Sequence, residues 1–129
     1  MLDGETGGLT WVNAGHNAPF LVRASGRVER LASCGPPLGI LSAPVYREER
    51  TSLASGDLLV VFTDGVTEAE DAAESQYGDP RLQTVVSEAA RRGEPAADVC
   101  RRVLDAVAAF AAGVDQYDDI TVVAAKTTR

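Results

Sequence analysis

The sequence of 129 residues contains few cysteines, one histidine, few aromatic residues and no long apolar run. Cys34 and Cys100 stand alone without CxxC spacing, which argues against a cysteine zinc site and a disulfide framework. No apolar run reaches about eighteen residues, and the N-terminus lacks the basic and apolar segments of a signal peptide. We therefore expect a cytoplasmic protein with reduced thiols and no membrane association.

Basic residues are also scarce. Twelve Lys and Arg against nineteen Asp and Glu give a net charge of -7, which repels nucleic-acid phosphates and excludes nucleic acid as an expected partner. The remaining composition, 45% hydrophobic and 24% charged, is ordinary for a globular protein. The length predicts one domain over residues 1–129.

Short strands are predicted in the first third of the chain. Residues 9–14 and 19–23 are rich in β-branched and aromatic residues and flank the turn Gly15-His16-Asn17, which predicts a β-hairpin. The turn Ser25-Gly26 leads into a third antiparallel strand at residues 27–31. Two prolines and two glycines make residues 35–39 a shaped loop.

Three further strands are predicted. Residues 46–52 alternate weakly and carry charges that suit an edge strand. Residues 58–62 are five successive apolar residues, which indicates a central strand covered on both faces. Residues 120–125 are apolar and β-branched and are predicted to form a second inner strand.

Two amphipathic helices are predicted between the last two strands. Asp79-Pro80 and Glu94-Pro95 are start signals, and Gly113 is the expected C-cap of the second helix. The apolar positions recur at helical spacing: Leu82, Val85, Val86, Ala89, then Val99, Val103, Val107 and Phe110. Strands followed by helices without βαβ alternation favour an α+β domain in which helices cover an antiparallel sheet.

Two acidic clusters stand at the ends of the most apolar strands. Asp64 follows the strand at residues 58–62, and Asp118 and Asp119 precede the strand at residues 120–125. A carboxylate at a strand end can reach a polar cleft and bind a hard divalent cation. Because neighbouring strand residues point to opposite faces, only one of Asp118 and Asp119 can be a ligand.

The same residues have simpler interpretations. A Thr-Asp-Gly turn or an acidic strand cap is by itself more often structural than ligating. His16, the only histidine, lies in a glycine turn, where a histidine is usually structural or exposed. Cys34 has no evident partner base and is not predicted to be a nucleophile.

In order along the chain, six motifs resemble the C-terminal half of the bacterial PPM-type serine/threonine phosphatases, in the sporulation protein E and sigma-regulator branch. The resemblance covers nearly the whole chain. The motifs are Asn13-Ala14-Gly15-His16-Asn17-Ala18-Pro19, Gly35-Pro36-Pro37-Leu38-Gly39, Ser55-Gly56-Asp57, Thr63-Asp64-Gly65-Val66-Thr67-Glu68-Ala69, Tyr77-Gly78 and Asp118-Asp119-Ile120-Thr121.

The resemblance implies an antiparallel β-sandwich flanked by helices, with two Mn²⁺ or Mg²⁺ ions at one edge. It implies that the metals activate a water that attacks the phosphorus of a phosphoserine or phosphothreonine. By position, Asp64 and Asp118 match metal ligands of the family, whereas Gly65, Asp119 and His16 match supporting positions. No catalytic residue other than these ligands is assigned to the chain.

The first half of the family carries an aspartate on an early strand and an Asp-x-x-Gly-His-Gly-like segment, and this sequence has no counterpart to either. Two carboxylates are too few for a binuclear centre, so we expect weak metal binding and little hydrolysis by the chain alone. We also expect self-association through open sheet edges.

The leading hypothesis is a phosphatase acting on a phosphorylated regulatory protein of the anti-sigma-factor antagonist type. The alternative is an inactive half-domain that acts as a protein-interaction module through the helices at residues 79–113.

Overall fold

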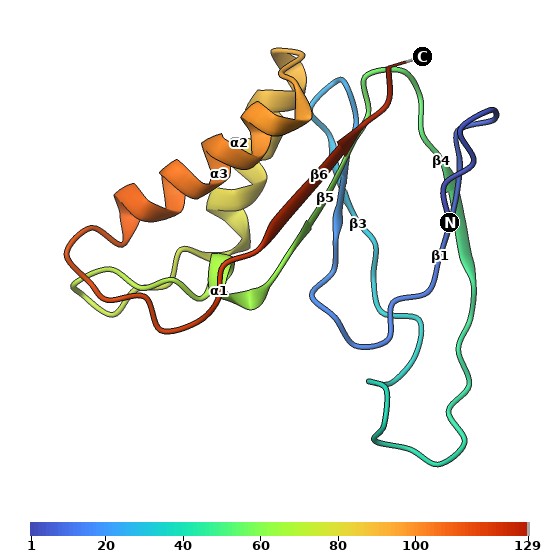
Figure 1. The fold of residues 1–129 in the computed structure, drawn as a ribbon, viewed down its shortest axis with the longest axis horizontal. Coiled ribbons are helices and arrows are strands. Elements are labelled where there is room, and N and C mark those ends of the chain that lie inside the picture. The colour runs from blue at the N-terminus through green and yellow to red at the C-terminus, as the bar shows by residue number, and fades with distance from the viewer. Residues whose placement is uncertain (129) are drawn as a thin grey trace.

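A computed structural model describes residues 1–128 and arranges them in three layers (Figure 1). The middle layer is a four-stranded antiparallel sheet in the order β3-β2-β5-β6, with α2 and α3 on one face and a two-stranded sheet of β1 and β4 beyond the other. The elements are β1 (Gly8–Trp11), β2 (Phe20–Val22), β3 (Val28–Arg30), β4 (Glu49–Ser52), β5 (Leu58–Phe62), α1 (Asp64–Thr67), α2 (Gly78–Arg91), α3 (Ala96–Phe110) and β6 (Val122–Lys126). The α+β prediction with antiparallel sheets is confirmed.

The larger core lies between the four-stranded sheet and the helices. Alternate residues of β5, Leu58, Val60 and Phe62, are buried toward α2 and α3, and the ring of Phe20 meets Phe62 edge to face at 4.9 Å between centroids. Helical side chains of the predicted apolar stripes complete this core: Leu82, Val86, Ala89, Val99, Val103 and Val107. The 3.6-residue period therefore identified the buried helix faces correctly.

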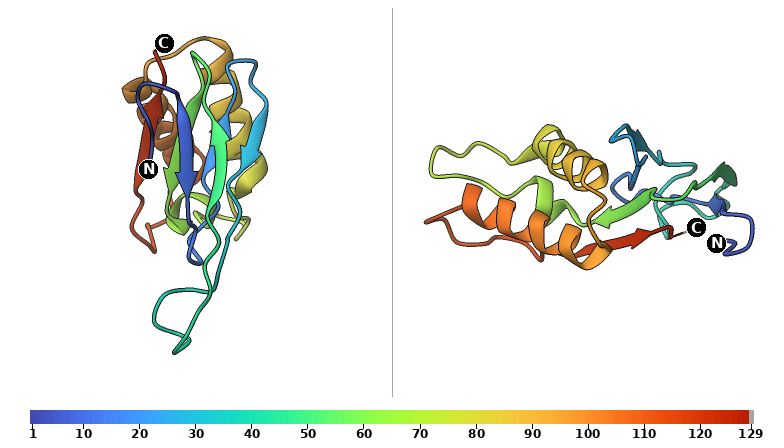
Figure 2. Two further views of the ribbon diagram at one scale, coloured as in Figure 1. Left: turned by 90° about the vertical axis from the view of Figure 1, so that its right-hand side faces the viewer. Right: turned by 90° about the horizontal axis from the view of Figure 1, so that it is seen from above.

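A smaller core lies between the two sheets. Leu21 of β2 packs with Leu9, Leu31 and Leu53, and Leu59 of β5 adds to this cluster. Figure 2 shows the two-stranded sheet lying in front of the larger one. Because β5 contributes side chains to both cores and pairs with a strand on each side, the prediction of a central strand covered on both faces is confirmed.

The predicted hairpin of residues 9–14 with 19–23 is wrong. β1 pairs with β4, in a register that places Leu9 opposite Thr51, whereas β2 pairs with β3 and β5. The reason is burial: Leu9 packs face to face against Leu21, which requires β1 to lie in another layer from β2. The hairpin propensity near Gly15 could not reveal that β1 pairs with β4 in preference to β2.

The prediction that residues 120–125 form an inner strand is also wrong. β6 begins at Val122 and lies at the edge of the four-stranded sheet, with no strand beyond it among residues 1–128. Val123 is 55% exposed because the two-stranded sheet does not cover this edge. An apolar, β-branched sequence was therefore insufficient to place the strand within the sheet.

The helices occur where they were predicted, but their ends differ. Asp79 lies in the first turn of α2 after the N-cap Tyr77, and its carboxylate pairs with Arg30 instead of capping the helix. Ala111 is the C-cap of α3, so Gly113 lies two residues beyond it with a φ of 88°. None of the helices within residues 1–128 is long and apolar enough to cross a bilayer.

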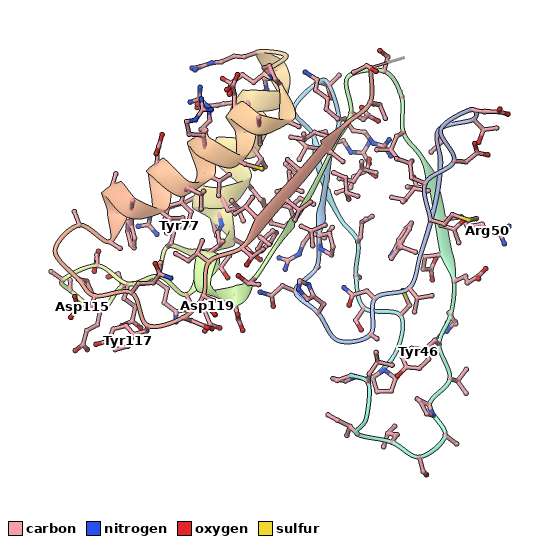
Figure 3. All side chains as sticks on the ribbon, viewed as in Figure 1. Tyr46, Arg50, Tyr77, Asp115, Tyr117 and Asp119 are labelled. Carbon is pink, nitrogen blue, oxygen red and sulfur yellow. The ribbon has the colours of Figure 1, made fainter. Side chains whose placement is uncertain are left out.

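The loop predicted at residues 35–39 is confirmed and extends away from both sheets (Figure 1). Tyr46 closes the loop beside Gly35, where an added Cβ would lie 2.4 Å from its ring. Figure 3 shows Tyr46 and Arg50 on the far side of the molecule from Tyr77 and Asp119. The helical layer and the small sheet therefore present separate surfaces.

Asp57 joins three segments at the turn before β5. Its side chain is 3% exposed and accepts hydrogen bonds from Arg23 Nη1 at 2.8 Å and from the N–H groups of Ala24 at 3.0 Å and Ala54 at 2.9 Å. Burial raises the pKa of Asp57, but the hydrogen bonds from Ala54, Arg23 and Ala24 outweigh burial, so the pKa lies below its ordinary value of 3.8. The ionised carboxylate therefore stabilises the fold.

Replacing Asp57 with alanine should lower the free energy of unfolding by about 3 kcal/mol, because the Arg23 guanidinium and two N–H groups lose their acceptor. Urea unfolding at pH 7 measures this loss. The contribution of Asp57 is fully present above pH 3.8 and is lost as the pH falls through the lower pKa of the folded state. The exposed control Glu49→Ala should change stability by less than about 0.5 kcal/mol; an equal effect of both variants would contradict this role.

The open edge of β6 should cause concentration-dependent self-association, because Val123 is exposed beside unpaired backbone groups. Size-exclusion chromatography with light scattering should show a mass above that of a monomer for the wild type and a shift toward monomer for Val123→Lys. Ala72→Lys adds the same charge in an exposed loop and should leave the distribution unchanged. A wild type that is monomeric at all concentrations would contradict the prediction.

Candidate metal centre

Asp64 lies at the point where β5 turns into the short helix α1. The strand ends at Phe62, and residues 64–67 form a single helical turn with Thr63 as the N-cap. The exposed carboxylate of Asp64 accepts a hydrogen bond from the N–H of Gly65 at 3.1 Å. The sequence predicted a sharp turn here; the chain instead forms a helical turn that follows the strand directly.

Thr63 joins this turn to the segment before β6. Its N–H donates to the carbonyl of Thr121 at 3.1 Å, and its hydroxyl donates to the carbonyl of Asp119 at 2.8 Å. The N–H of Thr121 donates back to the Thr63 hydroxyl at 3.0 Å. These three hydrogen bonds hold the two acidic motifs side by side.

Gly65 permits the close approach of the two backbones. A Cβ on this residue would lie 2.6 Å from the carbonyl oxygen of Asp119 and 3.3 Å from that of Asp118. A contact of 2.6 Å with backbone is too short for any side chain to occupy without movement. Gly65 therefore permits the contact between the two motifs by lacking a side chain, and its support of a metal site stays a prediction.

Asp118 and Asp119 serve the local structure in different ways. Asp118 is exposed, its Oδ1 accepts the N–H of Asp119 at 2.7 Å, and its carbonyl accepts the side-chain amide of Gln116 at 2.7 Å. Asp119 is held through its main-chain carbonyl, which accepts the Thr63 hydroxyl. This geometry agrees with the assignment of Asp118 as the ligand and Asp119 as support, and that assignment stays a prediction.

His16 lies in a loop that is organised by Asn13. The buried amide of Asn13, 6% exposed, accepts the N–H of His16 at 2.9 Å and donates to the carbonyl of His16 at 3.0 Å. The exposed ring of His16 is 2.9 Å from the carbonyl of Asn17 through Nδ1. No role beyond its motif was predicted for Asn13. Its position two residues before Gly15 is the signal in the sequence, because an asparagine side chain before a turn often bonds the backbone of that turn.

Asn17, the neighbour of His16, shares a cavity with residues that follow Asp64. Asn17 and Glu68 line one cavity of about 310 Å³, together with Thr67 and Phe62. His16 itself is not among the residues that line it. The support of the site by His16 stays a prediction, and the neighbouring Asn17 shares a cavity with Thr67 and Glu68.

Metal ligands are incomplete in the described part of the chain. Within residues 1–128 no three His, Cys, Asp or Glu side chains gather closely enough to hold a metal ion. Asp64 and Asp118 nevertheless offer exposed carboxylate oxygens, the donors that Mn²⁺ and Mg²⁺ accept, from two backbones fixed by Thr63 and Gly65. The residues fit one side of a metal centre.

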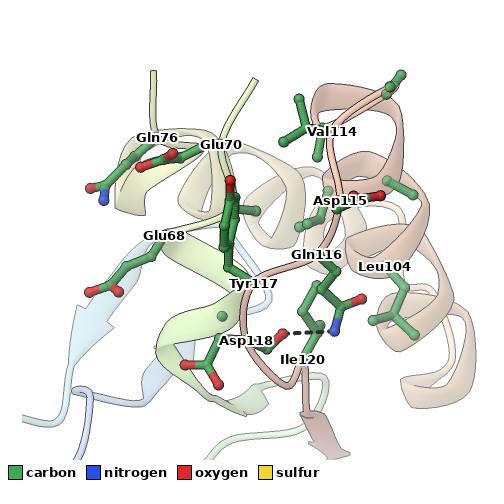
Figure 4. Close-up of a pocket in the computed structure, with 17 residues that line it drawn as sticks. Glu68, Glu70, Gln76, Leu104, Val114, Asp115, Gln116, Tyr117, Asp118 and Ile120 are labelled. Atoms are coloured by element: carbon green, nitrogen blue, oxygen red, sulfur yellow. Dashed lines mark hydrogen bonds between the residues drawn. The ribbon is translucent and has the colours of Figure 1, made fainter. Parts of the chain in front are cut away.

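A larger cavity of about 780 Å³ adjoins Asp118 (Figure 4). It extends from Gly65 and Asp118 to Gly113, past the C-terminal end of α3. Glu68 lines both this cavity and the smaller one, so it lies between them. This cavity could not be predicted from the sequence, because its walls come from three separate segments.

Residues 1–128 match the family model described as Stage II sporulation protein E (SpoIIE). The chain belongs to the SpoIIE family. Protein IcfG of Synechocystis sp. is 28% identical over 124 residues, which are 96% of this chain and 19% of that protein. The predicted family resemblance is thereby confirmed.

Solved structures agree on the fold. The RsbU and RsbW domains of Rv1364c from Mycobacterium tuberculosis superpose with a TM-score of 0.78 at 23% identity, covering 98% of this chain and 35% of that one. The SiaA-PP2C domain of Pseudomonas aeruginosa gives 0.78 at 20% identity, covering 94% and 47%. The phosphatase domain of SpoIIE from Bacillus subtilis gives 0.75 at 19% identity, covering 100% and 55%. This SpoIIE-family chain has the fold of part of a PP2C phosphatase domain.

The substitution Gly65→Ala should destabilise the protein by about 2 kcal/mol, because the new methyl group forces the backbones of α1 and Asp119 apart. Urea unfolding measures the change. Gly4→Ala is the control, since an added Cβ there meets nothing within 4 Å, and it should shift stability by less than about 0.5 kcal/mol. Equal stability of Gly65→Ala and the wild type would show that the two motifs do not depend on this contact.

Proposed function

We propose that residues 1–129 form the C-terminal part of a single PPM-type domain, a metal-dependent protein serine/threonine phosphatase. The observation that carries the proposal is the junction of the two acidic motifs through Thr63, Gly65 and Asp119, in a chain of the SpoIIE family. This junction lies at one end of the β5 and β6 pair, where exposed carboxylates can meet a phosphorylated protein from solution.

Asp64 and Asp118 are the proposed ligands of Mn²⁺ or Mg²⁺. Such ions, when bound, lower the pKa of a coordinated water and neutralise charge on a phosphoryl group. Gly65 and the carbonyl of Asp119 hold the two backbones in contact, so that the carboxylates are positioned before the metal arrives. Asn13 fixes the loop of His16 on the side of Glu68.

The proposed substrate is a phosphoserine or phosphothreonine on a regulatory protein of the anti-sigma-factor antagonist type. The support is the sigma-regulator branch that the motifs resemble, together with a solved relative that joins an RsbU domain to an RsbW domain. The net charge of -7 also disfavours a nucleic-acid phosphate as substrate.

The site needs ligands beyond this chain. The chain spans 55% of the SpoIIE phosphatase-domain chain that it matches, and it presents two of the proposed ligands. Mg²⁺ prefers six oxygen ligands in an octahedron, and a carboxylate that bridges two ions holds them close. We infer that residues 1–129 alone bind metal weakly and hydrolyse phosphoesters poorly.

A second function, an inactive half-domain that binds proteins through α2 and α3, is favoured by one observation. No group of three metal-ligating side chains occurs within residues 1–128. A surface of this kind would need neither metal nor turnover. Metal binding and metal-dependent turnover, measured together, therefore separate the two functions.

Titration of the chain with MnCl₂, followed by electron paramagnetic resonance of free Mn²⁺, should reveal binding with a Kd on the order of 1 mM. Asp64→Asn and Asp118→Asn should each weaken this binding about tenfold or more, because each removes a charged ligand. The control Asp105→Asn removes an exposed carboxylate on α3, outside both acidic motifs, and should leave the Kd unchanged. Hydrolysis of p-nitrophenyl phosphate at millimolar Mn²⁺, measured in parallel, should be slow and should disappear in Asp64→Asn.

If Asp64→Asn and Asp118→Asn bind Mn²⁺ as tightly as Asp105→Asn and the wild type, the assignment of the ligands is refuted. A complete lack of turnover with intact metal binding would favour the interaction module over the phosphatase.

A further inference from the structure

The cavity beside Asp118 combines an apolar floor with an acidic rim. Leu104, Val107 and Ala111 of the α3 side and Ile120 form apolar lining, and Leu104 is 42% exposed. The cavity has a volume of about 780 Å³, which lies within the range of pockets that bind ligands. An apolar surface of this kind is costly to leave in water and suits an apolar side chain of a partner.

Four carboxylates line the same cavity, and no basic residue does. Glu68, Glu70, Asp115 and Asp118 are the acids, and none of them takes part in an ion pair among residues 1–128. Figure 4 shows Glu70 and Asp115 on separate segments with Tyr117 between them. The rim therefore attracts positive charge from two sides.

Nearby cations are already engaged elsewhere. The guanidinium of Arg81 donates to the carbonyls of Gln76 and Tyr77 and lies 4.6 Å from the ring centroid of Phe110. Arg101 and Arg102, on the first half of α3, pair with Asp98 and Glu94. The acidic cavity is thus not neutralised by the protein's own basic side chains in the described residues.

The end of α3 adds to the same field. Its last turn carries no basic residue, and Ala108 and Ala111 at this end line the cavity. The C-terminal end of a helix of this length carries a partial negative charge from its free carbonyls. Carboxylates and helix end together favour a cationic ligand.

We propose that this cavity holds a segment of the protein substrate that carries both Arg or Lys and an apolar side chain, next to the phosphorylated residue. The inference rests on the proposed function, because Asp118 belongs both to the proposed metal centre and to the cavity wall. A phosphoserine that reaches Asp118 brings its neighbouring residues over Leu104, within reach of Glu70 and Asp115. The cavity thereby selects substrates by the residues that flank the phosphate.

Peptide binding to the chain tests the proposal without metal. The probe is fluorescein-labelled Leu-Arg-Ser-Leu-Lys-Arg-Leu in EDTA, and its counterpart carries Glu at each basic position. Fluorescence anisotropy should give at least about tenfold tighter binding of the basic peptide, and added salt should reduce the difference. Failure of the basic peptide to bind, or equal binding of both peptides, overturns the proposal.

Charge-reversal variants locate the binding. Glu70→Lys combined with Asp115→Lys should weaken binding of the basic peptide about tenfold. Glu49→Lys combined with Asp105→Lys makes the same change in net charge at exposed sites outside the cavity and should change the Kd by less than about twofold. Equal losses in the two pairs would mean attraction to the whole acidic protein and would overturn the assigned site.

Leu104→Ser tests the apolar floor without changing charge, and it should weaken binding about fivefold. Circular dichroism and thermal unfolding identify any variant that is misfolded. The result for Leu104→Ser can be interpreted even if a charge-reversal variant fails to fold. Unchanged binding in Leu104→Ser overturns the apolar part of the proposal.

The link to the metal centre is tested with the phosphoserine form of the basic peptide in MnCl₂. It should bind more tightly than the unphosphorylated form, and Asp118→Asn should abolish the gain. If Mn²⁺ binds in the earlier titration but the gain is absent while discrimination between the peptides persists, the cavity is not a substrate subsite. If Mn²⁺ binding fails by itself in the earlier titration, the proposed phosphatase function fails and the peptide surface is left intact.

Discussion

The register between β5 and β6 is the constraint on which the candidate site depends. Phe62 lies opposite Val122, the next backbone hydrogen bond joins Thr63 to Thr121, and the helical turn that follows places Gly65 against Asp119. A slip of one residue would turn every side chain of β5 to the other face of the sheet. Since Leu58, Val60 and Phe62 pack in the core beneath the helices, such a slip would remove them from the larger of the two cores. Core packing thus holds the two acidic motifs together through the backbone contacts of Thr63 and Gly65.

The carboxylates differ in whether they have a basic partner. Asp57, Glu29 and Glu94 pair with arginines, which favours the ionised forms and lowers the pKa of each of these carboxyls. Asp64 and the four acids of the larger cavity have no such partners among residues 1–128. Asp57 and Glu94 hold a turn and a helix start, whereas Asp64, Glu68, Glu70, Asp115 and Asp118 lie together where β5 leads into α1 and where the chain leads into β6. This contrast, more than the net charge, indicates where a cationic group would bind.

Much of the local structure could be predicted. The apolar run at residues 58–62 marked the central strand, and the helical periods marked the buried faces of α2 and α3, because each of these signals lies within one element. The motifs around Asp64 and Asp118 also identified the family. Pairing could not be predicted: β1 pairs with β4 although residues 12–48, which include β2 and β3, separate them in sequence, and β6 lies at an edge although its sequence resembles that of an inner strand. Asn13 and Asp57 were part of quoted motifs, yet their hydrogen-bond partners lie on distant segments.

The sequence by itself determined the candidate site residues: two acids beside apolar strands, a glycine after one of them, and an excess of negative charge. Tertiary structure alone decided that Gly65 touches Asp119, that Asp118 faces the same cavity as Glu70 and Asp115, and that an apolar floor lies beneath them. The physical reason is the different distance along the chain over which these effects act. Propensity, capping and periodicity act over a few neighbouring residues, whereas a cavity is formed by segments whose positions depend on the packing of the whole core.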